Sequence, residues 1–160
     1  MKDRKKKILP ERALLSKIQQ ARKAGKKIVT HNGSFDLLHL GHVRSLNEAK
    51  NQGDILVILL NSDRGVKLYK GPSRPIVPER ERAKMLEELS CVDYVTLLDD
   101  ITPIRILEKI RPHVHCNGLD WGKDCVEREV VEKYGGRIHV RRWVPEHCTR
   151  TLPGSSDAVD

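Results

Sequence analysis

The sequence has few aromatic residues and no long apolar run. Phe, Trp and Tyr make up 4% of its 160 residues, and 38% of the residues are hydrophobic. No stretch approaches the roughly 18 consecutive apolar residues that a membrane-spanning helix needs. A chain of this length and composition is typical of a globular protein with a single core. We therefore expect one domain over residues 1–160 and no membrane partner.

Disulfide and zinc patterns are also missing. The cysteines form neither a CxxC pair nor a spacing typical of metal ligands; they are Cys91, Cys116, Cys125 and Cys148. Reduced, partly buried thiols are therefore expected. The start of the chain, MKDRKKKILPER, is basic but has neither the apolar core nor the small-residue cleavage site of a secretory signal. The expected location is the cytoplasm.

Negative charge is the scarcer sign, with 22 Asp and Glu against 30 Lys and Arg and a formal net charge of +8. A basic surface can bind nucleic acid by neutralising its phosphates. Here much of the excess lies before residue 28, acidic residues are interleaved elsewhere, and few aromatic rings are present to stack on bases. These features favour small anionic ligands over a nucleic-acid partner.

Strand-like and helix-like segments alternate along most of the chain. Helical spacing of apolar residues favours helices at 10–24, 40–52, 79–90, 102–111 and 123–134. Short apolar or β-branched runs favour strands at 26–33, 54–61, 91–98, 113–117 and 137–144. Between these elements we expect a long loop at 62–78, and at the ends a basic N-terminal helical extension over 1–26 and a flexible tail over 153–160.

This alternation predicts an α/β fold, a Rossmann-like three-layer sandwich with a five-stranded parallel sheet and right-handed crossovers. Ligands of such sheets bind outside the carboxyl ends of the strands. The residues that follow each predicted strand are therefore the first place to look for chemistry.

Two histidines follow the first predicted strand, in the segment HNGSFDLLHLGH. Gly33 and Ser34 occupy the turn from strand to helix, where backbone N–H groups and the helix dipole favour an anion such as phosphate. His39 and His42 lie three residues apart on one helix face, so both imidazoles can reach the same phosphate group. Gly41 between them keeps a side chain away from the ligand. The pattern predicts a phosphate site.

This segment resembles the H-x-G-H signature of the nucleotidyltransferase superfamily, which includes cytidylyltransferases and adenylyltransferases. Further segments match in order, so the likeness extends from about residue 27 to residue 152; they read LLNSDRGV, KGPSRPIVPERERAKMLEEL, VDYV, NGLDW and EHCTRT. The subgroup that the chain resembles most is heptose 1-phosphate adenylyltransferase, whose substrate loop is similar to KGPSRPIVP. Glycerol-3-phosphate cytidylyltransferase is the alternative, because GLDWGK resembles its corresponding turn equally well.

The resemblance implies a reaction. A phosphate oxygen of the acceptor attacks the α-phosphorus of a nucleoside triphosphate and releases pyrophosphate, with no covalent enzyme intermediate. Catalysis of this kind comes from alignment and from neutralising charge. The implied catalytic residues are His39, His42 and Lys70, and the implied contacts to the phosphorylated substrate are Arg74 and Arg82.

The resemblance also implies contacts to the nucleotide. They fall to Asn32, Gly33, Ser34, Phe35, Asp36, Gly41, Asn61, Asp63, Gly118, Asp120, Trp121, Cys148, Thr149, Arg150 and Thr151. Asp36 has three further interpretations, as a carboxylate that orients a backbone turn, as a magnesium ligand and as a simple acidic residue at a helix start. Magnesium is expected with the triphosphate, held chiefly by phosphate oxygens and water. Relatives commonly pair as homodimers, and the same is expected here.

Three positions depart from the family pattern. Asn117 stands where adenylyltransferase relatives often carry lysine, Arg150 replaces a small hydroxyl residue, and Pro153 follows where the family continues with a helix. Three functions stay open. The first is transfer of AMP from ATP to D-glycero-β-D-manno-heptose 1-phosphate, giving ADP-heptose. The second is transfer from CTP to glycerol 3-phosphate or another polyol or sugar phosphate, and the third is nucleotide binding without catalysis.

Overall fold

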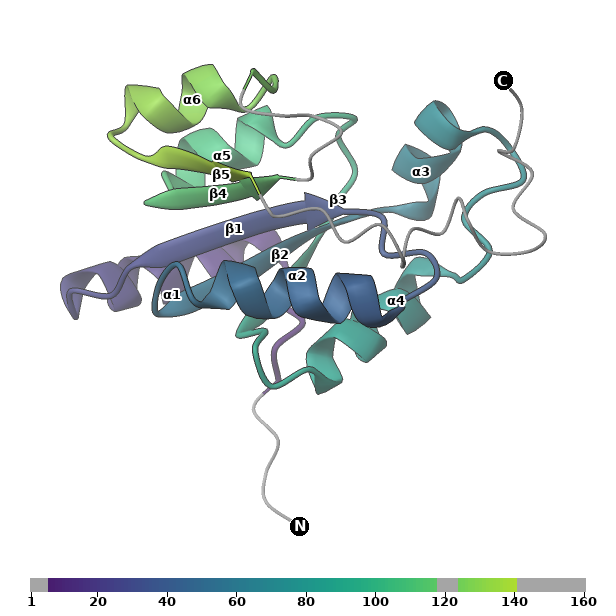
Figure 1. Ribbon diagram of the computed structural model, residues 1–160, viewed down its shortest axis with the longest axis horizontal. Coiled ribbons are helices and arrows are strands. Elements are labelled where there is room, and N and C mark those ends of the chain that lie inside the picture. Colours follow the sequence, from purple (N-terminus) through teal and green to yellow (C-terminus); the bar gives the residue numbers. More distant parts are fainter. Residues whose placement is uncertain (1–5, 118–123, 141–160) are drawn as a thin grey trace, which may run out of the picture.

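The structure is a computed structural model that describes residues 6–117 and 124–140. Its centre is a five-stranded parallel sheet (Figure 1). The strands are β1 (Ile28–Gly33), β2 (Ile55–Asn61), β3 (Tyr94–Leu98), β4 (Val114–Asn117) and β5 (Arg137–Val140). The helices are α1 (Glu11–Lys23), α2 (Leu40–Lys50), α3 (Asp63–Lys70), α4 (Glu79–Glu88), α5 (Ile104–Ile110) and α6 (Arg128–Lys133). The predicted fold class is confirmed.

The strand order across the sheet is β3-β2-β1-β4-β5. The chain builds outward from β1 to β3 and then returns to the other side of β1, so the direction of winding reverses between β1 and β4. Ligands of doubly wound sheets bind outside the carboxyl ends of the strands at such a reversal. In this chain the two strands at the reversal end at Gly33 and Asn117.

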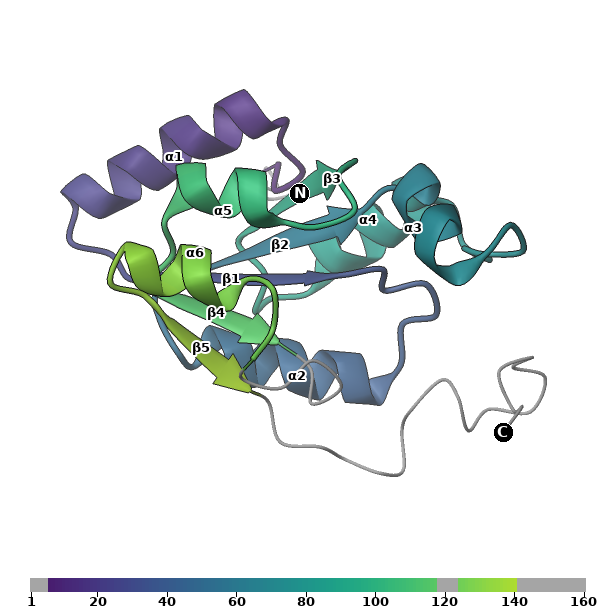
Figure 2. The same ribbon diagram turned by 90° about the horizontal axis from the view of Figure 1, so that it is seen from above.

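Helices cover both faces of the sheet, as the view from above shows (Figure 2). On one face, α1, α5 and α6 bury an apolar cluster whose fully buried members include Leu14, Ile28, Leu59 and Leu107. On the opposite face, α2 and α4 bury a second cluster, which includes Leu46, Ile58, Leu86 and Val95. A strand covered on both faces requires a near-continuous apolar sequence, and ILVILL in β2 meets that requirement.

The segment before β1 covers one edge and one face of the sheet. Lys7 and Leu9 pair with Val95 of β3 through two backbone hydrogen bonds of 2.9 Å, parallel to that strand. This pairing occupies an edge that would otherwise expose unpaired backbone groups. After α1, Gly25 takes a φ of +72°, a left-handed conformation that favours glycine just past a helix. The predicted end of this helix is confirmed.

The prediction of a continuous loop over 62–78 is wrong, because its first half forms α3. Ser62 caps this helix, since its Oγ accepts a hydrogen bond from the Gly65 backbone N at 3.1 Å. Gly65 and Val66 are buried, so tertiary packing stabilises a helix that is too short to form by propensity alone. α3 stands beyond the carboxyl ends of the strands in both views (Figures 1 and 2).

The other predicted elements are confirmed to within a few residues at their ends. α6 begins at Arg128, later than expected, and residues 118–123 lie outside the described part of the chain. The expected continuation of β5 to residue 144 and the expected tail at 153–160 also lie outside it. No helix within the described ranges is long and apolar enough to span a membrane.

The described cysteines are buried free thiols; they are Cys91, Cys116 and Cys125. Burial raises the pKa of Cys116 to about 12, which disfavours the reactive thiolate. These observations agree with the expected reduced, buried thiols. Cys148 lies outside the described residues.

β4 carries a histidine inside the fold. His115 has no exposed surface, and its Nδ1 lies 2.8 Å from Thr30 Oγ1 of β1. Burial lowers the pKa of His115 to about 3, with a smaller effect from the nearby His31. The ring is therefore neutral in the folded protein at pH values where an unfolded histidine, with a pKa of about 6.5, becomes protonated.

Replacing His115 with Asn should flatten the pH dependence of stability. Below about pH 6.5 the unfolded chain binds a proton at His115 and the folded protein does not. The free energy of unfolding should therefore fall by up to about 1.4 kcal/mol per pH unit until the pH nears the folded pKa. His115→Asn keeps an amide near Thr30 but does not titrate. Urea unfolding at several pH values measures the slope, and equal slopes in both proteins would contradict this account.

Candidate active site

The turn between β1 and α2 is shaped by Phe35, which is 4% exposed and takes a φ of +46°. A Cβ added to Gly33 would lie 3.0 Å from the Phe35 ring, so any larger residue here would have to displace that ring by a few tenths of an ångström. The ring centroid of Phe35 lies 5.6 Å from that of His31 and 5.4 Å from that of His42. Phe35 thus packs between the end of the strand and the start of the helix and supports His42.

His39 and His42 lie side by side at the start of α2. Their ring centroids are 4.0 Å apart and their planes differ by 36°. His39 precedes the helix as its N-cap, and the helix begins at Leu40 as the sequence predicts. The two predicted phosphate ligands are therefore neighbours in space.

Backbone hydrogen bonds define which nitrogen of each ring carries the proton. His39 Nδ1 accepts from the Gly41 backbone N at 3.1 Å, and His42 Nδ1 accepts from the His39 backbone N at 3.4 Å. A neutral imidazole that accepts at Nδ1 carries its proton on Nε2. Each ring therefore presents an N–H donor on the side away from the backbone group that it caps. The Gly41 and His39 backbone N–H groups are used in these bonds and are therefore not available to an anion.

Lys70 reaches this turn from the end of α3. Its Nζ donates a hydrogen bond to Ser34 Oγ at 3.2 Å. Partial burial raises the pKa of the neighbouring Tyr69, and its interaction with Ser34 opposes that rise. The sequence analysis does not identify Tyr69, for which the only available signal is its position beside Lys70.

Asp36 holds the loop at 71–78 against the turn. Its Oδ1 accepts from the backbone N of Ile76 at 2.8 Å and of Val77 at 2.9 Å, and its Oδ2 accepts from Arg74 Nη1 at 3.3 Å. Burial raises the pKa of Asp36, but these three hydrogen bonds outweigh burial and hold the pKa below its ordinary value. Among the roles proposed for Asp36, the structure shows the one in which its carboxylate orients backbone, here the N–H groups of Ile76 and Val77. Both oxygens are engaged in these bonds, which leaves fewer lone pairs for a magnesium ion.

Arg82 and Asp63 also serve the protein framework. Arg82 is 1% exposed, and its guanidinium donates to backbone carbonyl groups and to Asp63 Oδ1 at 2.6 Å. Asp63 Oδ1 in addition accepts from the Glu79 backbone N at 2.8 Å. The expected contact of Arg82 with substrate does not fit this burial, and these bonds occupy Oδ1 of Asp63.

Amide side chains line the end of the sheet at the winding reversal. Asn117 Nδ2 of β4 donates to Glu127 Oε2 at 3.2 Å, and both residues are buried. Asn32 Oδ1 of β1 is buried and has no hydrogen-bond partner among the described residues. Buried acceptors normally have a donor, so Asn32 requires one that the described residues do not supply.

The structure brings the described candidates to the carboxyl edge of the sheet. They are Asn32, Gly33, Ser34, Phe35, Asp36, His39, Gly41, His42, Asn61, Asp63, Lys70, Arg74 and Arg82. The remaining candidates, which lie outside the described residues, are Gly118, Asp120, Trp121, Cys148, Thr149, Arg150 and Thr151. The departures Arg150 and Pro153 lie outside them too.

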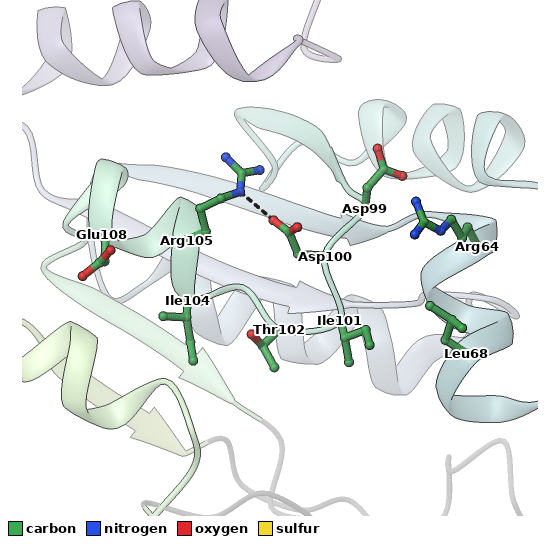
Figure 3. A pocket seen from close by; sticks show the side chains of 9 residues that line it. All are labelled: Arg64, Leu68, Asp99, Asp100, Ile101, Thr102, Ile104, Arg105 and Glu108. Atoms are coloured by element: carbon green, nitrogen blue, oxygen red, sulfur yellow. Dashed lines mark hydrogen bonds and ion pairs between the residues drawn. The ribbon is translucent and has the colours of Figure 1, made fainter.

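A pocket of about 590 Å³ lies at the same edge, between α3 and the segment that joins β3 to α5. Figure 3 shows Arg64 and Leu68 on the α3 side and Asp99 to Thr102 facing them. Asp100 accepts a hydrogen bond from Arg105 Nε at 2.7 Å. Its lining combines Arg64 of α3 and Arg105 of α5, three carboxylates (Asp99, Asp100 and Glu108) and apolar side chains, a mixture suited to a small polar molecule with some C–H surface.

Comparison with known proteins identifies the family. The profile of cytidylyltransferase-like proteins matches residues 30–158. The chain belongs to the cytidylyltransferase-like family. This membership agrees with the H-x-G-H resemblance and with the strand–turn–helix that carries the two histidines.

Curated relatives of this cytidylyltransferase-like chain include proteins named bifunctional protein HldE. The protein of Geobacter metallireducens is 46% identical over 140 residues, which cover 86% of this chain and 29% of that protein. The protein of Geobacter sulfurreducens is 45% identical over 141 residues, covering 87% and 29%. The chain therefore spans less than a third of the length of these relatives.

Solved structures share the fold. The lipopolysaccharide core biosynthesis protein from Thermoplasma volcanium superposes with a TM-score of 0.59 at 28% identity, covering 72% of this chain and 94% of that one. Pantoate-beta-alanine ligase from Francisella tularensis superposes with a TM-score of 0.52 at 13% identity, covering 86% and 68%. At that identity the second likeness concerns the fold alone.

Replacing Asp36 with Asn should destabilise the protein at neutral pH, because the ion pair with Arg74 is lost and the backbone donors of the loop keep a weaker acceptor. The expected loss is about 1–3 kcal/mol in the free energy of unfolding. A carboxylate with a lowered pKa stabilises the fold above its unfolded pKa of about 3.9, and this contribution disappears as pH falls through the folded pKa.

Urea unfolding of both proteins at neutral and acid pH measures this effect. The difference between them should shrink below about pH 4. Asp99→Asn, at an exposed carboxylate, is the matched control and should show little difference at any pH. A difference for Asp36→Asn that stays constant down to acid pH would disprove the assignment.

Proposed function

We propose that this chain transfers the adenylyl group of ATP to a sugar 1-phosphate, D-glycero-β-D-manno-heptose 1-phosphate, giving ADP-heptose and pyrophosphate. The observation that carries the proposal is the imidazole pair at the start of α2, with centroids 4.0 Å apart and both Nδ1 atoms bonded to backbone. Support for the acceptor comes from the resemblance of KGPSRPIVP to the heptose 1-phosphate adenylyltransferase loop. The relatives named HldE support the same subgroup.

In this reaction an oxygen of the acceptor phosphate attacks the α-phosphorus of ATP. A P–O bond forms to the acceptor, the bond from the α-phosphorus to the bridging oxygen breaks, and pyrophosphate leaves with the electron pair. Negative charge therefore grows on the α-phosphate oxygens and on the leaving group. The Nε2–H groups of His39 and His42 would donate to these oxygens, and the Lys70 ammonium would neutralise the pyrophosphate. Donors that are held in place before the reaction stabilise such a transition state most effectively.

Magnesium would accompany the triphosphate and balance part of its charge. Within the described ranges no group of three or more His, Cys, Asp or Glu side chains could hold a metal ion, and Asp36 is already engaged. We therefore expect phosphate oxygens and water to hold the ion, as magnesium commonly requires. A homodimer and a cytoplasmic location stay predictions.

The pocket between α3 and α5 is our candidate for the sugar of the acceptor. Arg64 can bind an anionic or hydroxyl oxygen, and Asp99 and Asp100 can accept hydrogen bonds from sugar hydroxyls. Leu68 and Ile101 are 59% and 63% exposed and can pack against the C–H groups of the ring. α3 connects this pocket with the histidine turn, because its last residue is Lys70.

An assay of pyrophosphate release tests the proposed function. The purified chain is supplied with ATP or CTP, each with the heptose 1-phosphate or with glycerol 3-phosphate. Mass spectrometry then measures the mass of the nucleotide product. ATP with the heptose 1-phosphate should react fastest. Faster reaction of CTP with glycerol 3-phosphate would replace the proposal by the cytidylyltransferase alternative. Nucleotide binding without pyrophosphate release from any pair would favour a non-catalytic protein.

His42 variants test the role of the imidazole pair. His42→Ala should lower kcat by about 10²–10³-fold, the usual effect of removing one positioned donor to a transition-state oxygen. Gln places its amide N–H near the position of Nε2, whereas Asn places it near Nδ1. His42→Gln should therefore retain more activity than His42→Asn, with thermal stability little changed. Equal activity of the two amide variants would contradict donation through Nε2.

An Arg64 variant tests the acceptor pocket. Arg64→Met should raise the KM for the sugar phosphate by about 10-fold or more, because a charged hydrogen bond contributes about 1.5–3 kcal/mol. The KM for the nucleotide should not change. Lys67→Met, at an exposed position of the same helix, is the matched control. An unchanged KM for the acceptor in Arg64→Met would contradict binding of the acceptor in this pocket.

A further inference from the structure

Arg82 has the largest side chain among the residues with less than 2% exposure. Arginine is rarely buried so completely, because removing a charge from water costs free energy unless the charge is paired and its N–H groups are bonded. Most buried side chains of α4 face the apolar cluster on the α2 side, and they include Ala83 and Leu86. The position of Arg82 therefore requires an explanation from its contacts.

The guanidinium of Arg82 joins three separate segments of the site. Its Nε donates to the Val77 carbonyl at 2.8 Å, in the loop that precedes α4. Its Nη1 donates to the Asn61 carbonyl at 2.9 Å, at the end of β2, and to the Ser34 carbonyl, in the turn that precedes the histidine pair. The remaining arm, Nη2, donates to Asp63 Oδ1 at 2.6 Å.

A second set of hydrogen bonds joins the start of α3 to the start of α4. The Asp63 backbone N donates to Glu79 Oε2 at 2.6 Å, and the Glu79 backbone N donates to Asp63 Oδ1 at 2.8 Å. The first residues of α3 and α4 therefore satisfy each other's helix-terminal N–H groups. The chain between them carries Lys70 and Arg74, and its far part is bonded to Asp36.

We propose that Arg82 is a positioning residue for the transfer reaction. It holds the turn at Ser34, the end of β2 and the loop at Val77 in one arrangement, and thereby sets where Lys70 and Arg74 lie relative to the histidine pair. The catalytic part of this inference rests on the proposed function. The positional part does not, because it concerns contacts within the protein.

The shape of the guanidinium is the essential property. Its donors lie in one plane at fixed angles and point to several acceptors at once, whereas a lysine ammonium is a single point charge on a flexible stem. Arg82→Lys therefore preserves the positive charge beside Asp63 but cannot reach all three carbonyl groups. A role limited to charge balance would survive this change, and a role in positioning would not.

Steady-state kinetics of Arg82→Lys tests the catalytic part. A displacement of reacting groups by about 1 Å can cost about 10²-fold in rate, so kcat per folded molecule should fall by roughly that factor. The KM for the nucleotide should change little. Arg80→Lys, at an exposed position of the same helix, is the matched control and should behave as the original protein. Full kcat in Arg82→Lys would overturn the proposal.

Amide hydrogen exchange tests the positional part without any need for activity. The backbone N–H groups of Ile76 and Val77 should exchange faster in Arg82→Lys than in Arg80→Lys, because the loop loses one of its two attachments. Unchanged exchange would overturn the proposal, and so would faster exchange with an unchanged kcat. If Arg82→Lys does not fold, Asp63→Asn removes one partner of the guanidinium and should show the same changes to a smaller extent.

The two proposals fail separately. Absence of pyrophosphate release by the unmodified protein with every substrate pair would reject the proposed function. The exchange rates at Ile76 and Val77 would then still decide whether Arg82 holds the loop.

Discussion

Parallel pairing of β1 with both β2 and β4 is the constraint on which the rest of the structure depends. Parallel strands end at the same edge of a sheet, so Ser34 after β1 and Asn61 at the end of β2 meet there although they are 27 positions apart in the chain. The winding reversal beside β1 leaves this edge open to a ligand. The histidine turn, the Lys70 helix and the pocket near Asp99 are brought to one end of the molecule by this topology.

Charged side chains at this edge divide into two groups. Asp36, Asp63 and Arg82 are bonded to backbone groups, and Asp63 and Arg82 also bond each other, so that they shape the turn and the loop. Lys70 and Arg64 lie in exposed positions, where an anion can approach them. The first group provides rigidity, because a buried hydrogen-bonded charge is costly to displace. The second group can provide charge for binding.

The backbone also prepares the histidine pair. In many phosphate sites the N–H groups of a helix terminus bind the anion directly. Here the Gly41 and His39 backbone N–H groups bond the imidazoles instead, which fixes the proton of each neutral ring on Nε2. Phe35 packs against His42 and limits its motion. The result is a pair of imidazole rings held in defined orientations.

Much of the fold and part of the site can be predicted from the sequence, and the limit has a physical reason. Apolar periodicity depends on burial, so ILVILL and the spacing in 79–90 were sufficient to predict β2 and α4. α3 could not be predicted in this way, because its eight residues depend on a Ser62 cap and on the burial of Gly65 and Val66. For a short helix, packing outweighs propensity.

The roles of Asp36 and Arg82 show the same limit for the site. The resemblance correctly brings both residues to the carboxyl edge, but a sequence does not state whether a charge at that edge points to a ligand or into the protein. The sequence by itself determined the fold class and the family, and it predicted many of the described residues at the carboxyl edge but neither Arg64 nor Tyr69, because the prediction follows from local pattern and motif spacing. Only the tertiary structure decided which of those charges are buried and bonded, since that depends on backbone groups brought together from distant parts of the chain.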